Sequence, residues 1–329
     1  MTGAAMTGPG GPAGGLVTVG ETLGLLVADD VGPLALARGM KLSMGGAESN
    51  VAIGVSRLGV PATWIGRLGR DPIGDLVERH LLAERVRCFV HRDDAPTAIM
   101  LRERRTSAAQ NVTYYRHGSA GSHLCPADLP DGVIEEAGAL HLTGITPALG
   151  EGPAAAVREA AGRARGAGVP VSVDLNYRSR LWDPATAAPV FRELAGYADV
   201  FFAGEDEARI ALEVDHQKQG SPQELAAALA ELGPREVVVK RGRHGATALI
   251  EGEPVDVPAV PVHAVDSVGA GDAFVAGYLA CRLTGRDPHE GLRTAAITGA
   301  LAVTVPGDWE ASPRPHELAL LSASEDVQR

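Results

Sequence analysis

The sequence predicts an α/β fold in which a mostly parallel central sheet is flanked by helices on both faces, with a small second β-sheet beside it. Two observations predict this fold. Short apolar, β-branched segments alternate along most of the chain with segments of helical pattern, and such runs are typical of strands covered on both faces. The alternation is interrupted once, between residues 97 and 117, by two strand-like segments joined by a polar hairpin, which we assign to the separate small sheet.

The N-terminal part of the chain is expected to open with the first core strand at residues 16–21, and the extended pattern continues over 23–27. A glycine-rich stretch, 45–50, then leads into a helix. The further elements expected here are helix 51–58, strand 62–66, a turn at 69–71, helix 72–84, and the two hairpin strands 98–103 and 111–116.

The C-terminal part resumes the alternation after Pro126. Strands are expected at 139–142, 170–174, 199–203 and 236–240, and helices at 152–166, 184–194, 206–212 and 222–232. Residues 245–249 are expected to begin a second small β segment that 255–265 extends, and two helices follow at 270–283 and about 289–303.

Composition excludes several classes of function. The chain has 329 residues with a net charge of −11, which argues against nucleic acid or an anionic membrane as the main partner. No stretch has the ~20 consecutive apolar residues of a membrane-spanning helix. The three cysteines, Cys88, Cys125 and Cys281, are far apart, so we expect reduced thiols in a cytoplasmic protein. Residues 1–15 are expected to form a disordered tail and 321–329 a frayed one.

One stretch, residues 266–272 (DSVGAGD), indicates a site for phosphoryl transfer at the start of an apolar helix. Gly269, Ala270 and Gly271 leave their backbone N–H groups free to converge on an anion, and Asp272 lies beside them, where it could accept a proton from an attacking hydroxyl. An ordinary helix start with Asp272 near the first free N–H groups is the alternative. The stretch matches neither the dinucleotide-binding fingerprint nor a Walker A loop.

Other polar residues follow predicted strands, where ligands collect in parallel sheets. They are Thr143, Asp174, Asn176, Arg178 and Glu207. Asn50 could cap its helix or bind a substrate hydroxyl. Tyr114 and Arg116 should share one face of their strand, with Tyr115 on the other, and could together contact a sugar with a carboxylate or phosphate; a solvated arginine beside a partly buried tyrosine is the alternative.

Over nearly all of residues 16–320, the chain resembles the ribokinase-like (PfkB-type) sugar kinases. Two signatures together carry this resemblance: residues 45–52 (GGAESNVA) with 57–59 (RLG) and 65–71 (IGRLGRD), and residues 266–279 (DSVGAGDAFVAGYL). Three further blocks resemble 2-keto-3-deoxygluconate kinases within the family: 114–122 (YYRHGSAGS), 141–149 (HLTGITPAL) and 174–182 (DLNYRSRLW). The resemblance implies a ribokinase-like kinase domain at 16–320 whose small sheet, from about 34–46 and 97–118, is a lid over the substrate.

The resemblance also implies a role for individual residues. Asp272 would be the general base, assisted by Gly269, Ala270 and Gly271. The sugar acid would be bound by Gly46, Ala47, Glu48, Ser49, Asn50, Met100, Tyr114, Arg116, Arg178 and Asp272. ATP would be bound by Asn176, Arg178, Gly204, Lys240, Gly242, Gly245, Gly269 and Gly271. Glu207 would contact Mg²⁺ through its water network, and K⁺ could bind near the Asp266 and Pro306 loops.

These roles imply transfer of the γ-phosphate of ATP to O6 of 2-keto-3-deoxygluconate or a close sugar acid. Three departures from the family pattern concern Gly204, which replaces an asparagine, Met100, which replaces a lid tyrosine, and Ala296, which replaces an asparagine near the adenine. The alternatives are a fructokinase or other ketose kinase, and a sugar- or nucleotide-binding regulator that has lost catalysis. A nicotinamide dehydrogenase is disfavoured because a complete Gly-x-Gly-x-x-Gly is missing. We also expect a homo-oligomer formed through the lid sheet.

Overall fold

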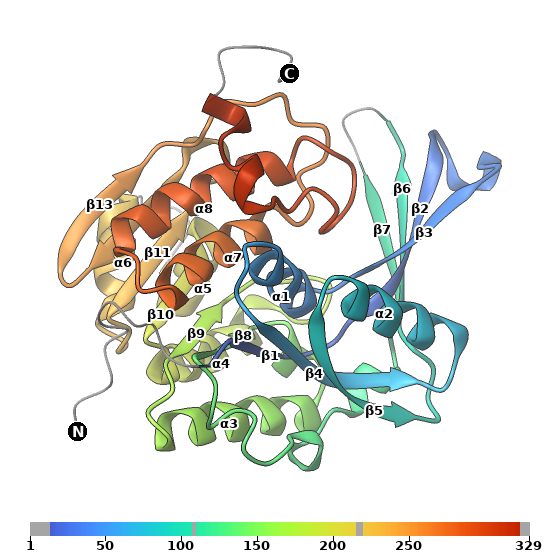
Figure 1. The fold of residues 1–329 in the computed structure, drawn as a ribbon, viewed down its shortest axis with the longest axis horizontal. Coiled ribbons are helices and arrows are strands. Elements are labelled where there is room, and N and C mark those ends of the chain that lie inside the picture. The colour runs from blue at the N-terminus through green and yellow to red at the C-terminus, as the bar shows by residue number, and fades with distance from the viewer. Residues whose placement is uncertain (1–13, 107–109, 215–219, 323–329) are drawn as a thin grey trace.

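The computed structural model describes residues 14–106, 110–214 and 220–322. Their strands form a nine-stranded sheet and a separate four-stranded sheet. In Figure 1 the small sheet projects from one side of the body that contains the large sheet. Most of the predicted tails, 1–13 and 323–329, lies outside the described residues.

The large sheet has the strand order β13-β12-β11-β10-β9-β8-β1-β4-β5. Its strands are β1 (Leu16–Val19), β4 (Ala62–Gly69), β5 (Val86–Asp93), β8 (Ala139–Thr143), β9 (Val171–Asp174), β10 (Val200–Gly204), β11 (Glu236–Lys240), β12 (Ala246–Ile250) and β13 (Glu253–Val257). All neighbours from β11 to β5 are parallel, and β12 and β13 add an antiparallel edge. Leu16 of β1 is in register with both Ala62 and Ala139, so the strand order reverses beside β1, where ligands typically bind.

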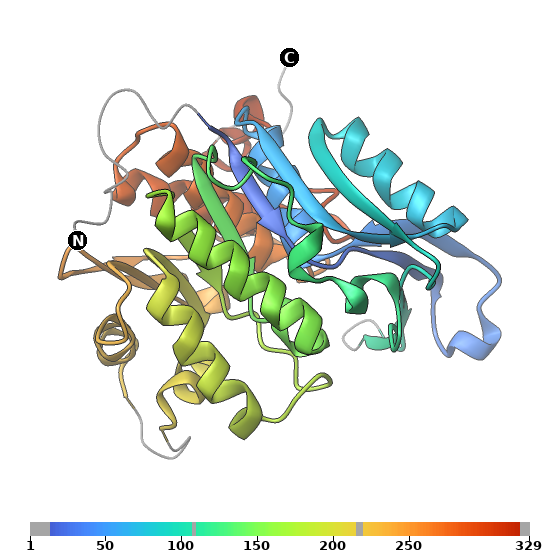
Figure 2. The ribbon, with the colours of Figure 1, turned by 90° about the horizontal axis from the view of Figure 1, so that it is seen from below.

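Helices cover both faces of this sheet. One face is packed by α3 (Glu151–Gly166), α4 (Pro184–Tyr197), α5 (Glu205–Leu212) and α6 (Pro222–Ala230), and the other by α1 (Ala47–Arg57), α2 (Pro72–Ala83), α7 (Ala270–Leu283) and α8 (Pro288–Ala302). Figure 2 shows α3 and α4, in green and yellow-green, across the first face.

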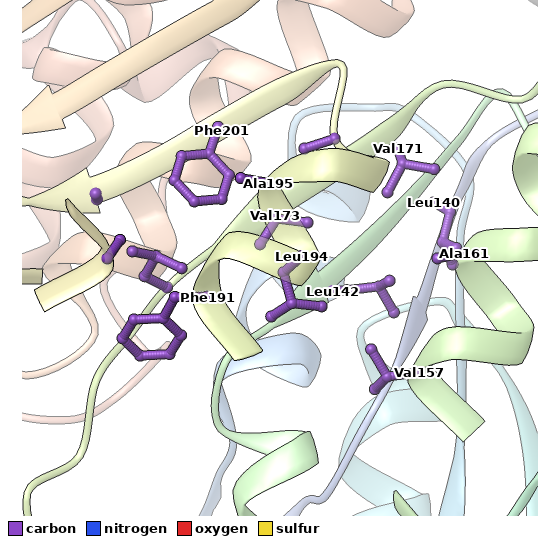
Figure 3. Close-up of a cluster of buried hydrophobic side chains, with 14 of the residues drawn as sticks. Leu140, Leu142, Val157, Ala161, Val171, Val173, Phe191, Leu194, Ala195 and Phe201 are labelled. Atoms are coloured by element: carbon purple, nitrogen blue, oxygen red, sulfur yellow. The ribbon is translucent and has the colours of Figure 1, made fainter. Parts of the chain in front are cut away.

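A hydrophobic core lies on each face of the large sheet. Successive residues of a strand point alternately into one core and the other, because of the pleat of the strand. On β10, Phe201 packs with the α3 to α6 side, whereas Phe202 packs with α7 on the other. Figure 3 shows the first core, where Leu140 of the sheet lies beside Ala161 of α3, and Val173 lies toward α4, which carries Leu194 and Phe191. Strand β10 therefore carries apolar residues on both faces and lacks polar alternation.

The small sheet has the order β3-β2-β6-β7. Its strands are β2 (Leu23–Val31), β3 (Met40–Gly45), β6 (Ile99–Arg104) and β7 (Asn111–Tyr115). β6 and β7 form the predicted antiparallel hairpin, and β2 runs parallel to β6. Leu25 and Met100 lie in a small apolar cluster that Tyr114 packs against.

Two predictions of the elements were wrong, and one strand was missed. Residues 23–27 do not continue the first core strand, because the chain leaves the large sheet at Gly20 and Leu23 pairs with Gly45 in the small one. Residues 246–257 do not form a second small β segment; they form strands β12 and β13, which are the antiparallel edge of the large sheet. Strand β5 was missed because this edge strand mixes apolar residues with Arg87, His91 and Arg92 without a regular alternation.

Two predictions of absence concern the described part of the chain. None of its helices combines the length and apolar character needed to cross a bilayer. Cys88, Cys125 and Cys281 are free thiols, as predicted.

Candidate active site

The turn at residues 266–272 forms the start of α7, as the sequence predicts. Gly269 caps the helix with φ 74°, and a Cβ at that position would overlap the carbonyl oxygen of Asp308. Only glycine fits such a left-handed position pressed against another backbone. The N–H groups that open α7 are consequently presented where the helix dipole favours an anion.

Asp272 lies in the first turn of α7 with only 8% of its surface exposed. Its carboxylate accepts hydrogen bonds from Asn50 Nδ2 at 2.8 Å and Asn176 Nδ2 at 3.3 Å. Burial raises the pKa of Asp272 to about 6, although the hydrogen bond from Asn50 opposes the shift. Two amides from distant elements thus hold a carboxylate whose pKa lies below neutral pH, and a carboxylate in that state can accept a proton.

The hydrogen bond from Asn50 to Asp272 shows that Asn50 does not cap its helix. Helix α1 begins at Ala47, four residues earlier than predicted, and its N-cap is Gly46. Asn50 is therefore inside the first turn, where its amide binds Asp272. Its Oδ1 is buried and has no hydrogen-bond partner among the described residues, so it is free to accept a hydrogen bond from a ligand.

Lys240, at the end of β11, provides a cation beside the turn. Its Nζ lies 2.6 Å from both carboxylate oxygens of Asp174 and 3.7 Å from the position that a Cβ on Gly271 would take. Burial alone would lower the pKa of Lys240, but Asp174, Glu207 and Asp272 together raise it. The ammonium group therefore stays charged next to the anion-binding N–H groups.

Asp272 faces a central cavity of about 400 Å³ between the large and small sheets. The predicted residues that line it are Gly46, Ala47, Glu48, Asn50, Met100, Tyr114, Arg116, Asn176, Arg178, Lys240, Gly269, Gly271 and Asp272. A wider outer cavity of about 870 Å³ shares Tyr114, Arg116 and Arg178 with the central one. Two arginines thus lie where the central cavity opens outward.

Tyr114 and Arg116 lie together as the alternation of β7 predicts. The guanidinium carbon of Arg116 is 5.2 Å from the centre of the Tyr114 ring, while Tyr115 on the other face is 65% exposed. Arg116 is not simply solvated, because it forms an ion pair with the buried carboxylate of Glu21. Ser119 Oγ donates to the other oxygen of Glu21 at 2.8 Å.

Glu48 and Ser49 form hydrogen bonds within the protein. Glu48 is 1% exposed, and its Oε1 accepts hydrogen bonds from Thr143 Oγ1 at 2.7 Å and Thr146 Oγ1 at 2.6 Å. Burial raises the pKa of Glu48 to about 7. Ser49 is fully buried and donates to the Gly46 carbonyl at 3.0 Å. These hydrogen bonds fix the start of α1, and Glu48 also lines the central cavity.

A third, mostly apolar cavity of about 520 Å³ adjoins the other side of the turn. Of the predicted residues, Lys240, Gly242, Gly245, Ala270 and Gly271 line it. Phe274, Val260 and Ala296 form part of its walls, so Ala296 leaves the wall apolar where an asparagine was expected. Lys240, Ser267 and Gly271 line both this cavity and the central one, so the two cavities meet at the turn.

Four residues predicted to bind the nucleotide do not line the apolar cavity. Asn176, Arg178 and Gly269 line the central cavity, and within the described residues Gly204 lines neither of the two cavities. Gly204 instead donates its N–H to Glu207 Oε2 at 2.6 Å, and Tyr177 N–H binds Glu207 Oε1 at 2.9 Å. The described residues contain no group of three or more His, Cys, Asp or Glu side chains that could hold a metal ion.

Sequence reasoning missed three charged residues of the central cavity, Glu21, Arg102 and Asp308. Arg102 binds Asp266 Oδ2 and Asp308 Oδ1, each at 3.1 Å. Burial raises the pKa of Asp308 to about 7, and Arg102 opposes that shift. For Arg102 a signal existed, since the two-residue period of its strand places it on the same face as Met100.

Comparison with known proteins adds an independent line of evidence. The profile of the pfkB family carbohydrate kinases matches residues 14–315. The 2-dehydro-3-deoxygalactonokinase of Haloferax volcanii is 36% identical, with 89% of this chain and 92% of that protein covered. The 2-dehydro-3-deoxygluconokinase of Bacillus subtilis is 34% identical, with 95% and 97% covered. A fructokinase of Klebsiella pneumoniae is also 34% identical, with 83% and 90% covered.

Solved structures agree over the whole fold. The 2-dehydro-3-deoxygluconokinase of Thermotoga maritima superposes with a TM-score of 0.85 at 27% identity, covering 93% of this chain and 97% of that one. An Escherichia coli protein described as a candidate ribokinase II, in complex with ATP and Mg²⁺, gives 0.84 at 26% identity, with 94% and 99% covered. A Vibrio cholerae fructokinase variant with fructose, ADP and potassium bound gives 0.81 at 26% identity, with 93% and 98% covered.

Proposed function

Since the chain belongs to the pfkB family of carbohydrate kinases, we propose that it phosphorylates O6 of 2-keto-3-deoxygluconate, or of a close 2-keto-3-deoxy sugar acid, with ATP. One observation carries the choice of acceptor. The central cavity has a carboxylate base, Asp272, on the turn, and it has Arg116 and Arg178 where it opens outward. A sugar acid with a primary hydroxyl at one end and a carboxylate at the other suits that arrangement.

The proposed reaction is an in-line displacement. O6 attacks the γ-phosphorus and its proton passes to Asp272, while the bond from the γ-phosphorus to the bridging oxygen breaks and ADP leaves. The N–H groups of Gly269, Ala270 and Gly271 would stabilise the charge that develops on the phosphoryl oxygens. Lys240 would add a fixed positive charge on the same side.

The apolar cavity supports binding of the nucleotide. Ala296 and Phe274 offer an apolar wall to a base, and Gly242 and Gly245 let the backbone approach closely. Mg²⁺ would supply charge neutralisation on the phosphates. Because both oxygens of Glu207 already accept backbone N–H groups, a contact of Glu207 with Mg²⁺ would run through water.

Potassium does not fit the Asp266 side chain. The carboxylate of Asp266 accepts from Arg102 at 3.1 Å, from Gln110 at 3.3 Å, and from the N–H groups of Val268 and Gly307 at 3.2 Å each. These neighbours are donors, whereas a monovalent cation requires oxygen acceptors. We therefore derive no step through K⁺.

A ketose kinase is the second candidate, and one observation favours it. Glu21 already neutralises Arg116, and Met100 offers no hydroxyl, so the cavity is less specialised for an acid than its arginines alone suggest. The similarity to fructokinases agrees with this alternative.

A panel of acceptors tests the proposal. ADP release would be followed by coupled NADH oxidation for 2-keto-3-deoxygluconate, its C4 epimer, fructose and ribose, at matched Mg²⁺ and K⁺, and NMR of the product would locate the phosphate. We expect kcat/KM to be highest for one of the two sugar acids, with the phosphate on O6. Equal turnover of fructose or ribose without turnover of the acids would refute it. ATP binding without turnover of any acceptor would instead support a regulator.

The predicted homo-oligomer stays a prediction. Large apolar side chains are exposed on or beside the small sheet, namely Val31, Leu36, Leu42 and Tyr115. A second copy could cover them, and light scattering after size-exclusion chromatography would give the oligomeric state.

A further inference from the structure

Arg102 is a buried arginine that the proposed reaction does not use. It lies on β6 of the small sheet, and its side chain is 2% exposed. A buried guanidinium is costly unless carboxylates surround it. Here it binds one oxygen of Asp266 and one oxygen of Asp308, each at 3.1 Å, and both carboxylates belong to the body of the protein.

Both partners of Arg102 are connected to the 266–272 turn. Asp266 opens the turn, and its Oδ1 accepts the Val268 N–H at 3.2 Å. The backbone of Asp308 is pressed against Gly269, which leaves no space for a Cβ there. A displacement of either aspartate would therefore move the backbone that presents the anion-binding N–H groups.

The 305–310 loop that contains Asp308 also contacts a second strand of the small sheet. Ser43 Oγ donates to Glu310 Oε1 at 2.7 Å, and Trp309 Nε1 donates to the Met44 carbonyl at 3.2 Å. Glu310 in turn accepts the Asp308 N–H at 2.8 Å. The loop thus lies between the small sheet and the turn and touches both.

We propose that Arg102 is a positioning residue whose guanidinium supplies the positive charge between Asp266 and Asp308. It fixes the 266–272 turn only while the small sheet is packed against the body of the protein. The kinetic consequence rests on the proposed kinase function. Without the small sheet in place the turn loses its support, so phosphate transfer is favoured only when the small sheet covers the acceptor. The same guanidinium makes a bound monovalent cation unnecessary at Asp266.

Arg102→Ala and Arg102→Lys test this role, with Arg105→Met as the matched control. Arg105 follows β6, is exposed, and reaches Glu103 only at 4.0 Å. Because small misplacements of reacting groups are costly, we expect kcat with the sugar acceptor to fall about 10²-fold in Arg102→Ala, with a smaller change in the KM for ATP. Arg102→Lys, which keeps the charge, should lose less.

Chemical rescue separates positioning from general stability. Millimolar guanidinium should restore most of the lost kcat in Arg102→Ala and have no effect on the wild type or on Arg105→Met. Potassium should not stimulate the wild type. Failure of guanidinium to rescue folded Arg102→Ala, or a requirement of the wild type for K⁺, would overturn the inference.

Hydrogen exchange makes the test independent of the acceptor. Amides of residues 266–272 and 305–310 should exchange faster in Arg102→Ala and Arg102→Lys than in the wild type or Arg105→Met. Unchanged exchange in both variants would overturn the coupling even if the wild type phosphorylates no sugar. Faster exchange with no turnover by the wild type would refute the proposed function alone.

Discussion

Replacing Asp272 by asparagine should separate catalysis from stability, because the buried carboxylate is proposed to accelerate the reaction while its ionisation destabilises the folded state. The substitution removes the proposed general base, and loss of a general base typically costs about 10²–10⁴-fold in rate. That range corresponds to about 3 to 5 kcal/mol of transition-state stabilisation. We therefore expect kcat to fall by about that factor while the fold is retained.

The stability of the same variant follows from the pKa. Burial raises the pKa of Asp272 from 3.8 to about 6, so ionising it costs the folded state about 3 kcal/mol at pH 8. A group with a raised pKa contributes its full stability below pH 3.8 and loses it as the pH rises through 6. Asp272→Asn should hence be more stable than the wild type at pH 8 by up to about 3 kcal/mol. This gain is reduced by about 1 kcal/mol or more, because the new amide N–H faces the N–H donor of Asn50 or Asn176 and one hydrogen bond is lost. The advantage should shrink by about 1 kcal/mol at pH 5.

The assay combines kinetics and unfolding. The kcat/KM of the wild type should fall about tenfold per pH unit below pH 6, and the residual rate of Asp272→Asn should lack this dependence. Denaturant unfolding at pH 5 and 8 would measure stability. Asp206→Asn is the control, because Asp206 is exposed and forms an ion pair with Arg209 on its own helix. A drop in kcat of less than about tenfold would show that Asp272 is not the base.

Three further changes have defined outcomes. Glu48→Gln removes a buried carboxyl group, and burial raises the pKa of that group from 4.5 to about 7. The free energy of unfolding of the variant, measured with denaturant, should therefore exceed that of the wild type by up to about 3 kcal/mol above pH 7 and by little below pH 5. The same dependence of unfolding free energy on pH in both proteins would contradict this. Arg116→Gln leaves Glu21 without its ion pair and should raise KM for the sugar acid about 10- to 100-fold while changing kcat for fructose little; equal losses with both acceptors would count against recognition of a carboxylate. Gly269→Ala should cost about 1–2 kcal/mol for the left-handed backbone plus the overlap with Asp308, and lower kcat sharply in the coupled assay; kinetics like those of the wild type would contradict the proposed turn.

Some of the site was predictable because its causes are local. The 266–272 turn needs Gly269 in a left-handed conformation and small residues beside it, and adjacent residues in the sequence specify both. The shared face of Tyr114 and Arg116 follows from the two-residue period of a strand. These features did not require knowledge of the rest of the fold.

Other parts of the site depend on contacts between distant segments. Glu21 and Arg116 are 95 residues apart, and Arg102 and Asp308 are 206 apart. Whether Asn50 caps its helix or holds Asp272 could not be decided from residues 45–58, because Asp272 approaches from 222 residues away. The strand at residues 23–31 was misplaced for a similar reason, since an extended apolar segment does not specify which sheet it joins.

The sequence by itself determined the parallel α/β core and the glycine turn with its aspartate, because short-range periodicity and turn chemistry encode both, and the motifs at residues 45–52 and 266–279 carried the resemblance to carbohydrate kinases. Only the tertiary structure decided which charges meet. It paired Arg116 with Glu21, enclosed Glu48 between two threonines, and set Arg102 between Asp266 and Asp308. Pairings of this kind depend on how the two sheets pack together, and the strength of each ion pair depends on the burial that only the packed chain creates.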